Sequence, residues 1–128
     1  MAATFSTAGK LFDGYAVNRS VFRELLPDHR WYLYAAGLVN PNDANTATIS
    51  LRYQKYDTTT VTLGSVTQAG SGLVKKSMGP FDLFAVGGVP MTETVVVIRL
   101  NAQKSAGVDG TIECWNIWLR LLPFLGST

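Results

Sequence analysis

A charge-poor stretch near the carboxyl end, "VVVIRLNAQKSAGVDGTIECWNIWLRLL" (residues 95–122), constrains the fold more than any other part of the sequence. Side chains alternate between the two faces of a β-strand, so Val96, Ile98 and Leu100 share one face of the first half. The middle of the stretch, "QKSAGVDG", contains an Asp-Gly pair, which is a strong turn signal. The pattern therefore predicts two strands folded around a turn as a hairpin.

The second strand of this predicted hairpin carries apolar residues on both faces. Trp115, Ile117 and Leu119 share one face, whereas Ile112 and Cys114 have the opposite parity. Either a β-bulge near Cys114 resets the alternation, or both faces of the strand are covered. A strand of this kind belongs in the middle of a sheet that another layer covers.

Strand patterns continue upstream of this stretch. "WYLYAAGLV" is followed by the turn formers "NPNDAN" and then by "TATISLRYQKY", which alternates apolar and polar residues, so the pair predicts a second hairpin. "TTTVTLGSVTQ" has the pattern of a further strand. Six to eight short strands separated by turn signals about every 8 to 12 residues favour an antiparallel sandwich or barrel over any βαβ fold.

We therefore predict an all-β protein, a single antiparallel β-sandwich over residues 1–128 with the jelly roll as its expected topology. At most one short helix is expected, near residues 19–26, where an apolar i, i+4 stripe precedes Pro27. Residues 1–16 are a candidate extended N-terminal arm, and residues 123–128 a candidate C-terminal tail.

Composition narrows the classes of partner. Charged residues make up 16% of the chain, against about 25% in a typical domain, so the surface is either hidden in an assembly or polar through uncharged side chains. The net charge of +2 comes without a concentrated basic stripe, so we do not expect nucleic-acid binding. The start "MAATFSTAGKLF" does not have the pattern of a signal peptide, and no apolar run is long enough for a membrane span.

The residues that usually carry catalysis or bind metals are few. His29 is the only histidine and Cys114 the only cysteine. We interpret His29 as a surface or interface residue and Cys114 as a small buried apolar side chain, and we predict no enzyme, no catalytic residue, no metal site and no cofactor. Oxygen ligands for calcium are offered by Asn40, Asn42 and Asp43 and by Asp109, but neither stretch has the EF-hand spacing, and Asn and Asp favour turns for backbone reasons alone.

Aromatic residues on the predicted strands are the best candidates for contacts with a partner. Neighbours in a strand point to opposite faces, so at least one residue of each close aromatic pair lies on the outer side of its sheet. There it stacks on a ligand such as a sugar ring, packs against another subunit, or is covered by loops. The candidate assembly or glycan-contact surface comprises Trp31, Tyr32, Tyr34, Trp115, Trp118 and Arg120. The candidate terminal-arm contacts are Phe5, Phe12 and Phe124.

The apolar strand "TVVVIRLNAQ", the glycine-bearing turn and the closing strand "TIECWNIWLRLL" resemble the final hairpin of jelly-roll sandwiches. That arrangement is similar in galactose-binding-like carbohydrate modules and in the small jelly-roll proteins that decorate virus capsids. The resemblance covers about thirty residues (the span of one such hairpin), and no binding residue is carried over with it.

Two functions of different classes follow as expectations. The first is a non-enzymatic structural subunit of a viral capsid, decoration or fibre type, made in the host cytoplasm and located in the virion. Its partners would be copies of itself or other capsid subunits, reached through sheet faces and terminal arms. The alternative is a carbohydrate-binding module whose outward aromatic side chains contact a surface glycan.

Overall fold

The computed structural model describes residues 2–18, 29–55, 58–84, 89 and 95–123. Their strands are β1 (Ala2–Phe5), β2 (Lys10–Asn18), β3 (His29–Asn40), β4 (Ala47–Gln54), β5 (Thr60–Gln68), β6 (Val74–Asp82), β7 (Val95–Lys104) and β8 (Gly110–Pro123). None of these described residues is helical. The short helix predicted near residues 19–26 lies outside the described residues.

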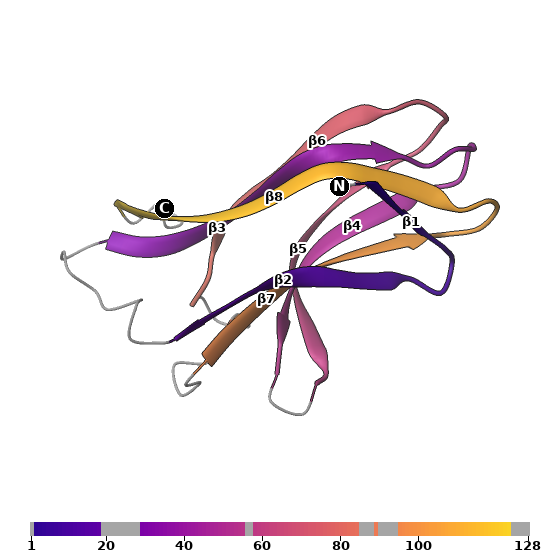
Figure 1. The fold of residues 1–128 in the computed structure, drawn as a ribbon. Helices are drawn as coiled ribbons and strands as arrows, with labels where there is room; N and C mark the ends of the chain where they lie inside the picture. The colour runs from indigo at the N-terminus through magenta and orange to yellow at the C-terminus, as the bar shows by residue number, and fades with distance from the viewer. Residues whose placement is uncertain (1, 19–28, 56–57, 85–88, 90–94, 124–128) are drawn as a thin grey trace.

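The strands form two antiparallel four-stranded sheets that lie on one another as two layers (Figure 1). One sheet has the order β1-β8-β3-β6, and the other has the order β2-β7-β4-β5. The prediction of an all-β antiparallel sandwich is confirmed. The prediction that the last strand lies inside a sheet also holds, because β8 is hydrogen-bonded to β1 on one side and to β3 on the other.

The pairing predicted for the two hairpins is wrong. β7 pairs with β2 and β4, whereas β8 pairs with β1 and β3, so the two strands of residues 95–122 lie in different sheets. β3 and β4 are likewise in different sheets. The reason is that two strands with one apolar face each can bury these faces in two ways. They can pair side by side in one sheet, or they can lie in different sheets that face each other. Both arrangements have the same alternation of apolar and polar residues. Of the described strands, only β4 and β5 are consecutive in sequence and adjacent in one sheet.

Residues 2–18, where the sequence allowed an extended arm, belong to the two sheets. β1 pairs with the start of β8, with Phe5 opposite Gly110, and β2 pairs with β7. Gly110 makes room for the first of these contacts, since a Cβ there would lie 2.5 Å from the Phe5 ring. The N-terminal segment therefore supplies one edge strand to each layer.

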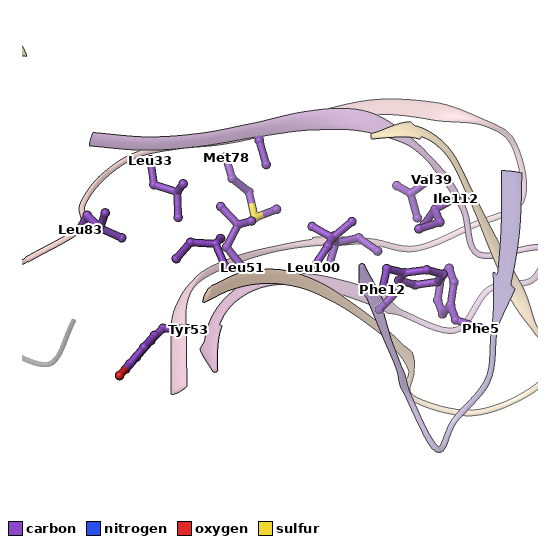
Figure 2. Close-up of a cluster of buried hydrophobic side chains, with 14 of the residues drawn as sticks. Phe5, Phe12, Leu33, Val39, Leu51, Tyr53, Met78, Leu83, Leu100 and Ile112 are labelled. Carbon is purple, nitrogen blue, oxygen red and sulfur yellow. The ribbon is translucent and has the colours of Figure 1, made fainter. Parts of the chain in front are cut away.

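The core lies between the layers and is formed by the faces that alternation predicts. Ile49 and Leu51 on β4 and Ile98 on β7 are buried, and they face Leu33 and Met78 of the other sheet. Figure 2 shows Leu33 and Met78 from one layer pointing toward Leu51 from the other. Burial of each such side chain contributes roughly 1.5–3 kcal/mol, so this layer of contacts holds the two sheets together.

A β-bulge interrupts β8 near Cys114, where the sequence left a bulge as one of two alternatives. Between the register pairs Leu38–Glu113 and Ala36–Asn116, β8 advances one residue more than β3 does. Cys114 within this step has a φ of 56°, in the left-handed region. Of the two alternatives, the bulge is the one that the structure contains, and the expectation that Cys114 is buried is wrong, because the bulge leaves it exposed.

Beyond the bulge, β8 turns its large apolar residues to the core. Trp115, Ile117 and Leu119 pack against the buried cluster. Gly37 on β3 leaves the space that Trp115 occupies, since a Cβ at Gly37 would lie 2.4 Å from the indole ring. The Trp115 Nε1 donates a hydrogen bond of 2.9 Å to the carbonyl of Leu38, which satisfies its polar atom.

Candidate interaction surface

The face of the β1-β8-β3-β6 sheet that is turned away from the core carries an exposed aromatic pair. Trp118 on β8 lies directly opposite Tyr34 on β3. Their ring centroids are 5.6 Å apart and the ring planes differ by 5°, which is a stacked arrangement. Trp118 is 39% exposed. We call this side of the sheet the outer face, with Trp118 and Tyr34 at its centre.

Arg120 follows Trp118 on the same side of β8. Its guanidinium carbon lies 6.0 Å from the centre of the Tyr34 ring, within the range of a cation–π contact. The outer face therefore brings together three of the predicted contact residues, Tyr34, Trp118 and Arg120. They come from β3 and β8, the two central strands of this sheet.

The remaining predicted aromatic contacts are placed differently. Trp31 and Trp115 pack against the core from the inner side of the sheet. Tyr32 is opposite Arg120 in the register and shares the outward parity of Tyr34, but it is only 4% exposed. The structure therefore leaves Tyr34 and Trp118 as the aromatic side chains of this group that a partner can reach.

The terminal-arm residues do not form an exposed group. Phe5 and Phe12 are buried members of the hydrophobic core (Figure 2), so their side chains are not available to a neighbouring subunit. They are buried because their strands are parts of the two sheets. Phe124 lies outside the described residues.

Small residues surround the aromatic pair. Tyr34 lies opposite the Gly79–Pro80 step of β6, between the register pairs Leu33–Phe81 and Ala35–Met78. Gly79 has a φ of 106°, and a Cβ there would lie 2.5 Å from the carbonyl oxygen of Leu33, so a side chain is excluded at this position. The row of Tyr34 therefore has no side chain at Gly79, whereas Trp118 is 39% exposed at its β8 end.

Charged side chains lie at both ends of the outer face. Glu113 on β8 and Lys75 on β6 occupy one end, each opposite Leu38 of β3. Arg120 and Asp82 occupy the other, each opposite Tyr32. Asp82 Oδ2 also accepts a hydrogen bond of 3.4 Å from Arg30 Nη1. Sequence reasoning missed the residues of β6, although the alternation of Lys75 and Ser77 before Gly79 could have identified one side of a strand.

A second polar cluster joins the loops at one end of the sandwich. The fully buried Lys104 Nζ at the end of β7 donates a hydrogen bond of 2.6 Å to the Pro41 carbonyl and another to Asp43 Oδ1. Asp43 also accepts hydrogen bonds of 2.9 Å from the backbone N–H groups of Asn45 and Val108. The Lys104 ammonium, followed by these N–H groups, holds the pKa of the Asp43 carboxyl well below its ordinary value.

The side chains of the "NPNDAN" turn that offer oxygen atoms are engaged in hydrogen bonds within the chain. The carboxylate of Asp43 is bonded to an internal cation, Lys104, and Asn42 Nδ2 donates to the Asp109 carbonyl at 2.9 Å. Asn40 Oδ1 accepts from the N–H groups of Asn42 and Gly72. Across the part of the chain that the structure describes, no group of three or more His, Cys, Asp or Glu is placed to hold a metal ion.

Within the described ranges, no helix has the length and hydropathy needed to cross a membrane. No family model, no curated protein and no solved structure matches this chain.

Proposed function

We propose that this protein is a structural subunit of jelly-roll type that assembles with copies of itself, in a viral capsid or as a decoration or fibre-type protein of the virion. The strand order supports the jelly roll. β8 lies beside β1 and β7 beside β2, so the end of the chain runs back along its beginning in both sheets. Eight strands in two sheets, connected as two Greek keys, are the jelly-roll arrangement found in viral capsid and lectin domains.

The observation that carries the proposal of self-assembly is the stacked aromatic pair on the outer face, of which Trp118 is exposed and Tyr34 half-buried. Trp118 is 39% exposed beside Tyr34, and the Gly79–Pro80 step of β6 lies on the other side of Tyr34. Exposed aromatic surface with a flat surround is typical of protein contacts, where tryptophan and tyrosine contribute much of the binding energy. The low charge of the chain, 16%, supports the same conclusion.

The test is the mass of the protein in solution. One chain has a mass of 13.9 kDa. We expect multi-angle light scattering to give a mass at least twice this value at micromolar concentration, and a further rise with concentration. A mass that stays at that of one chain up to millimolar concentration would contradict self-assembly.

Glycan binding is a second candidate, favoured by the chemistry of the same aromatic pair. A stacked Tyr34 and Trp118 present an aromatic surface, and Arg120 is close enough to donate hydrogen bonds to hydroxyl groups. An apolar stacking surface with a few placed polar groups is the usual design of a sugar site. A glycan array should then give binding that Trp118→Ala abolishes. Equal binding by the parent and by Trp118→Ala, or no binding at all, would eliminate this candidate.

A further inference from the structure

Four cross-strand rows run over the outer face from β8 through β3 to β6. The register pairs define them in order along the strands as Glu113–Leu38–Lys75, Asn116–Ala36–Ser77, Trp118–Tyr34–Gly79/Pro80 and Arg120–Tyr32–Asp82. The outer strands of this trio are about 9–10 Å apart, twice the spacing of paired strands. Each row therefore places one residue of β8 on one side of β3 and a different residue of β6 on the other side.

The charges in the two terminal rows have opposite order. In the first row the acid, Glu113, is on β8 and the base, Lys75, is on β6. In the last row the base, Arg120, is on β8 and the acid, Asp82, is on β6. A rotation that exchanges β8 and β6 consequently puts an acid over a base at both ends of the face.

We propose that the outer face is the contact between two copies of this chain, related by a two-fold axis that runs along β3. This inference depends on the self-assembly proposed above and names the surface that carries it. The axis lays β8 of one copy over β6 of the other. Glu113 then meets Lys75 of the second copy, and Arg120 meets its Asp82, which already has Arg30 of its own chain as a partner. Each pair occurs twice because a two-fold contact uses the same surface on both copies.

The side chains in the central row fit the same axis. Trp118 is the exposed large side chain on β8, and the row places it over the Gly79–Pro80 step of the second copy, where Gly79 carries no side chain. Proline and the backbone of glycine offer an indole ring a flat surface to pack on. In the neighbouring row the exposed amide of Asn116 lies over the exposed hydroxyl of Ser77, which is a donor and acceptor pair.

Sheet twist is compatible with these contacts. Two sheets that pack face to face are rotated by about 30°, so residues in the terminal rows are shifted sideways relative to those near the axis. The long side chains of Lys75 and Arg120 can follow that shift, whereas Trp118 lies in a central row where the shift is small. The indole is therefore the anchor of the contact, and the charges fix its orientation.

Charge reversal gives a test with two variants, each of which should associate weakly by itself but should associate with the other. Glu113→Lys puts a base opposite Lys75 at both symmetric contacts, and Lys75→Glu puts an acid opposite Glu113. We expect each variant alone to associate at least about tenfold more weakly than the parent, because like charges placed opposite each other disfavour a complex. An equal mixture of the two should recover association as a heterodimer, since every contact then joins an acid to a base.

The masses of the parent, both variants and their mixture are measured by sedimentation velocity at low salt. Lys55→Glu is the matched control, because Lys55 is exposed at the end of β4 in the other sheet and undergoes the same change of charge. It should keep the parent's mass. Trp118→Ala is a second variant without a change of charge, and it should also weaken association about tenfold or more if the indole is the anchor.

Several outcomes overturn the proposed contact. One is a parental mass in both charge variants or in Trp118→Ala, and another is a mixture that stays dissociated. A two-fold axis across the strands would pair Glu113 with Arg120 instead, and then a mixture of Glu113→Lys with Arg120→Glu would associate where the first mixture does not. A parent that is itself monomeric overturns the proposed function as well, whereas an associated parent with unaffected variants overturns only this contact.

Discussion

Lys104 is the residue whose environment departs most from what its position in the sequence indicates. It ends an apolar strand, yet its ammonium is fully buried and bonded to Asp43 and to the Pro41 carbonyl. A buried cation is tolerated only when it is paired and hydrogen-bonded. The pair ties the turn after β3 to the end of β7, which joins the two layers at this end of the sandwich.

Asp43→Asn should lower the free energy of unfolding at pH 7 and flatten its dependence on acid pH. The pKa of Asp43 is lowered in the folded state, so its carboxylate stabilises the fold above its ordinary pKa of 3.8, and that contribution is lost as the pH falls through the folded value. The difference between parent and variant should therefore be largest at pH 7 and shrink below about pH 4. Urea unfolding at a series of pH values measures it.

Lys104→Met is the matched control for this pair. It removes the buried charge, and Asp43 keeps the N–H groups of Asn45 and Val108 as partners. We expect a smaller loss of stability than in Asp43→Asn, in which the buried ammonium has lost its counter-charge. The reverse order of the two variants would contradict this account of the cluster.

Gly37→Ala should destabilise the protein by about 1–3 kcal/mol, the usual cost of overpacking. The added Cβ would lie 2.4 Å from the Trp115 ring, which is held in place by its hydrogen bond to Leu38. Urea unfolding gives the change in free energy. In a Trp115→Leu background the effect of Gly37→Ala should fall by more than half, because the smaller side chain leaves room. An equal effect in both backgrounds would show that the indole is not the cause.

At the scale of the elements, β8 shows what a local pattern can decide. The parity change between Ile112 and Trp115 predicted either a bulge or two covered faces, and the structure has the bulge at Cys114. The strands β3, β4, β5, β7 and β8 lie where the sequence pattern placed them. The strands with which β3, β4, β7 and β8 pair were predicted wrongly. The alternating pattern that buries one face is the same whether a strand pairs with its neighbour in sequence or faces it from the other sheet.

Leu51→Ala should lower the free energy of unfolding by about 2–5 kcal/mol, as expected for a cavity in a packed core. Leu51 is fully buried on β4, in the layer of contacts that joins the two sheets. The control is Val108→Ala, since Val108 is 56% exposed and its loss should change stability by no more than about 0.5 kcal/mol. Similar losses in both variants, measured by chemical denaturation, would contradict the two-layer core.

At the scale of the whole molecule, the exposed thiol of Cys114 reports on assembly. Cys114 lies on β8 beside the rows of the outer face and is exposed in the single chain. If two copies meet through this face, the reaction of the thiol with a maleimide should slow as protein concentration rises, in parallel with the increase in mass. A reaction rate that stays constant while the mass increases would place the contact elsewhere on the molecule.

The candidate surface was only partly accessible to prediction. The sequence predicted Tyr34, Trp118 and Arg120 among six candidate contact residues without deciding which of the aromatic residues face outward, and the structure groups these three. It could not identify Lys75 or Gly79 as their neighbours, because β6 and β8 are far apart in the chain and come together only through β3. Nor could it show that Phe5 and Phe12 are buried, since burial depends on which strands cover them.

The alternation of side chains along each strand is a local property, and the sequence by itself therefore determined the all-β class and the buried faces of β4 and β7. For β8 it left a bulge near Cys114 as one of two alternatives. Strand partners are a different matter. Every residue except proline has the same backbone N–H and C=O groups, so the amino-acid sequence does not specify which strands are hydrogen-bonded to each other. Only the tertiary structure decided which sheet each strand joins, the burial of Lys104, and the rows of charge on the outer face.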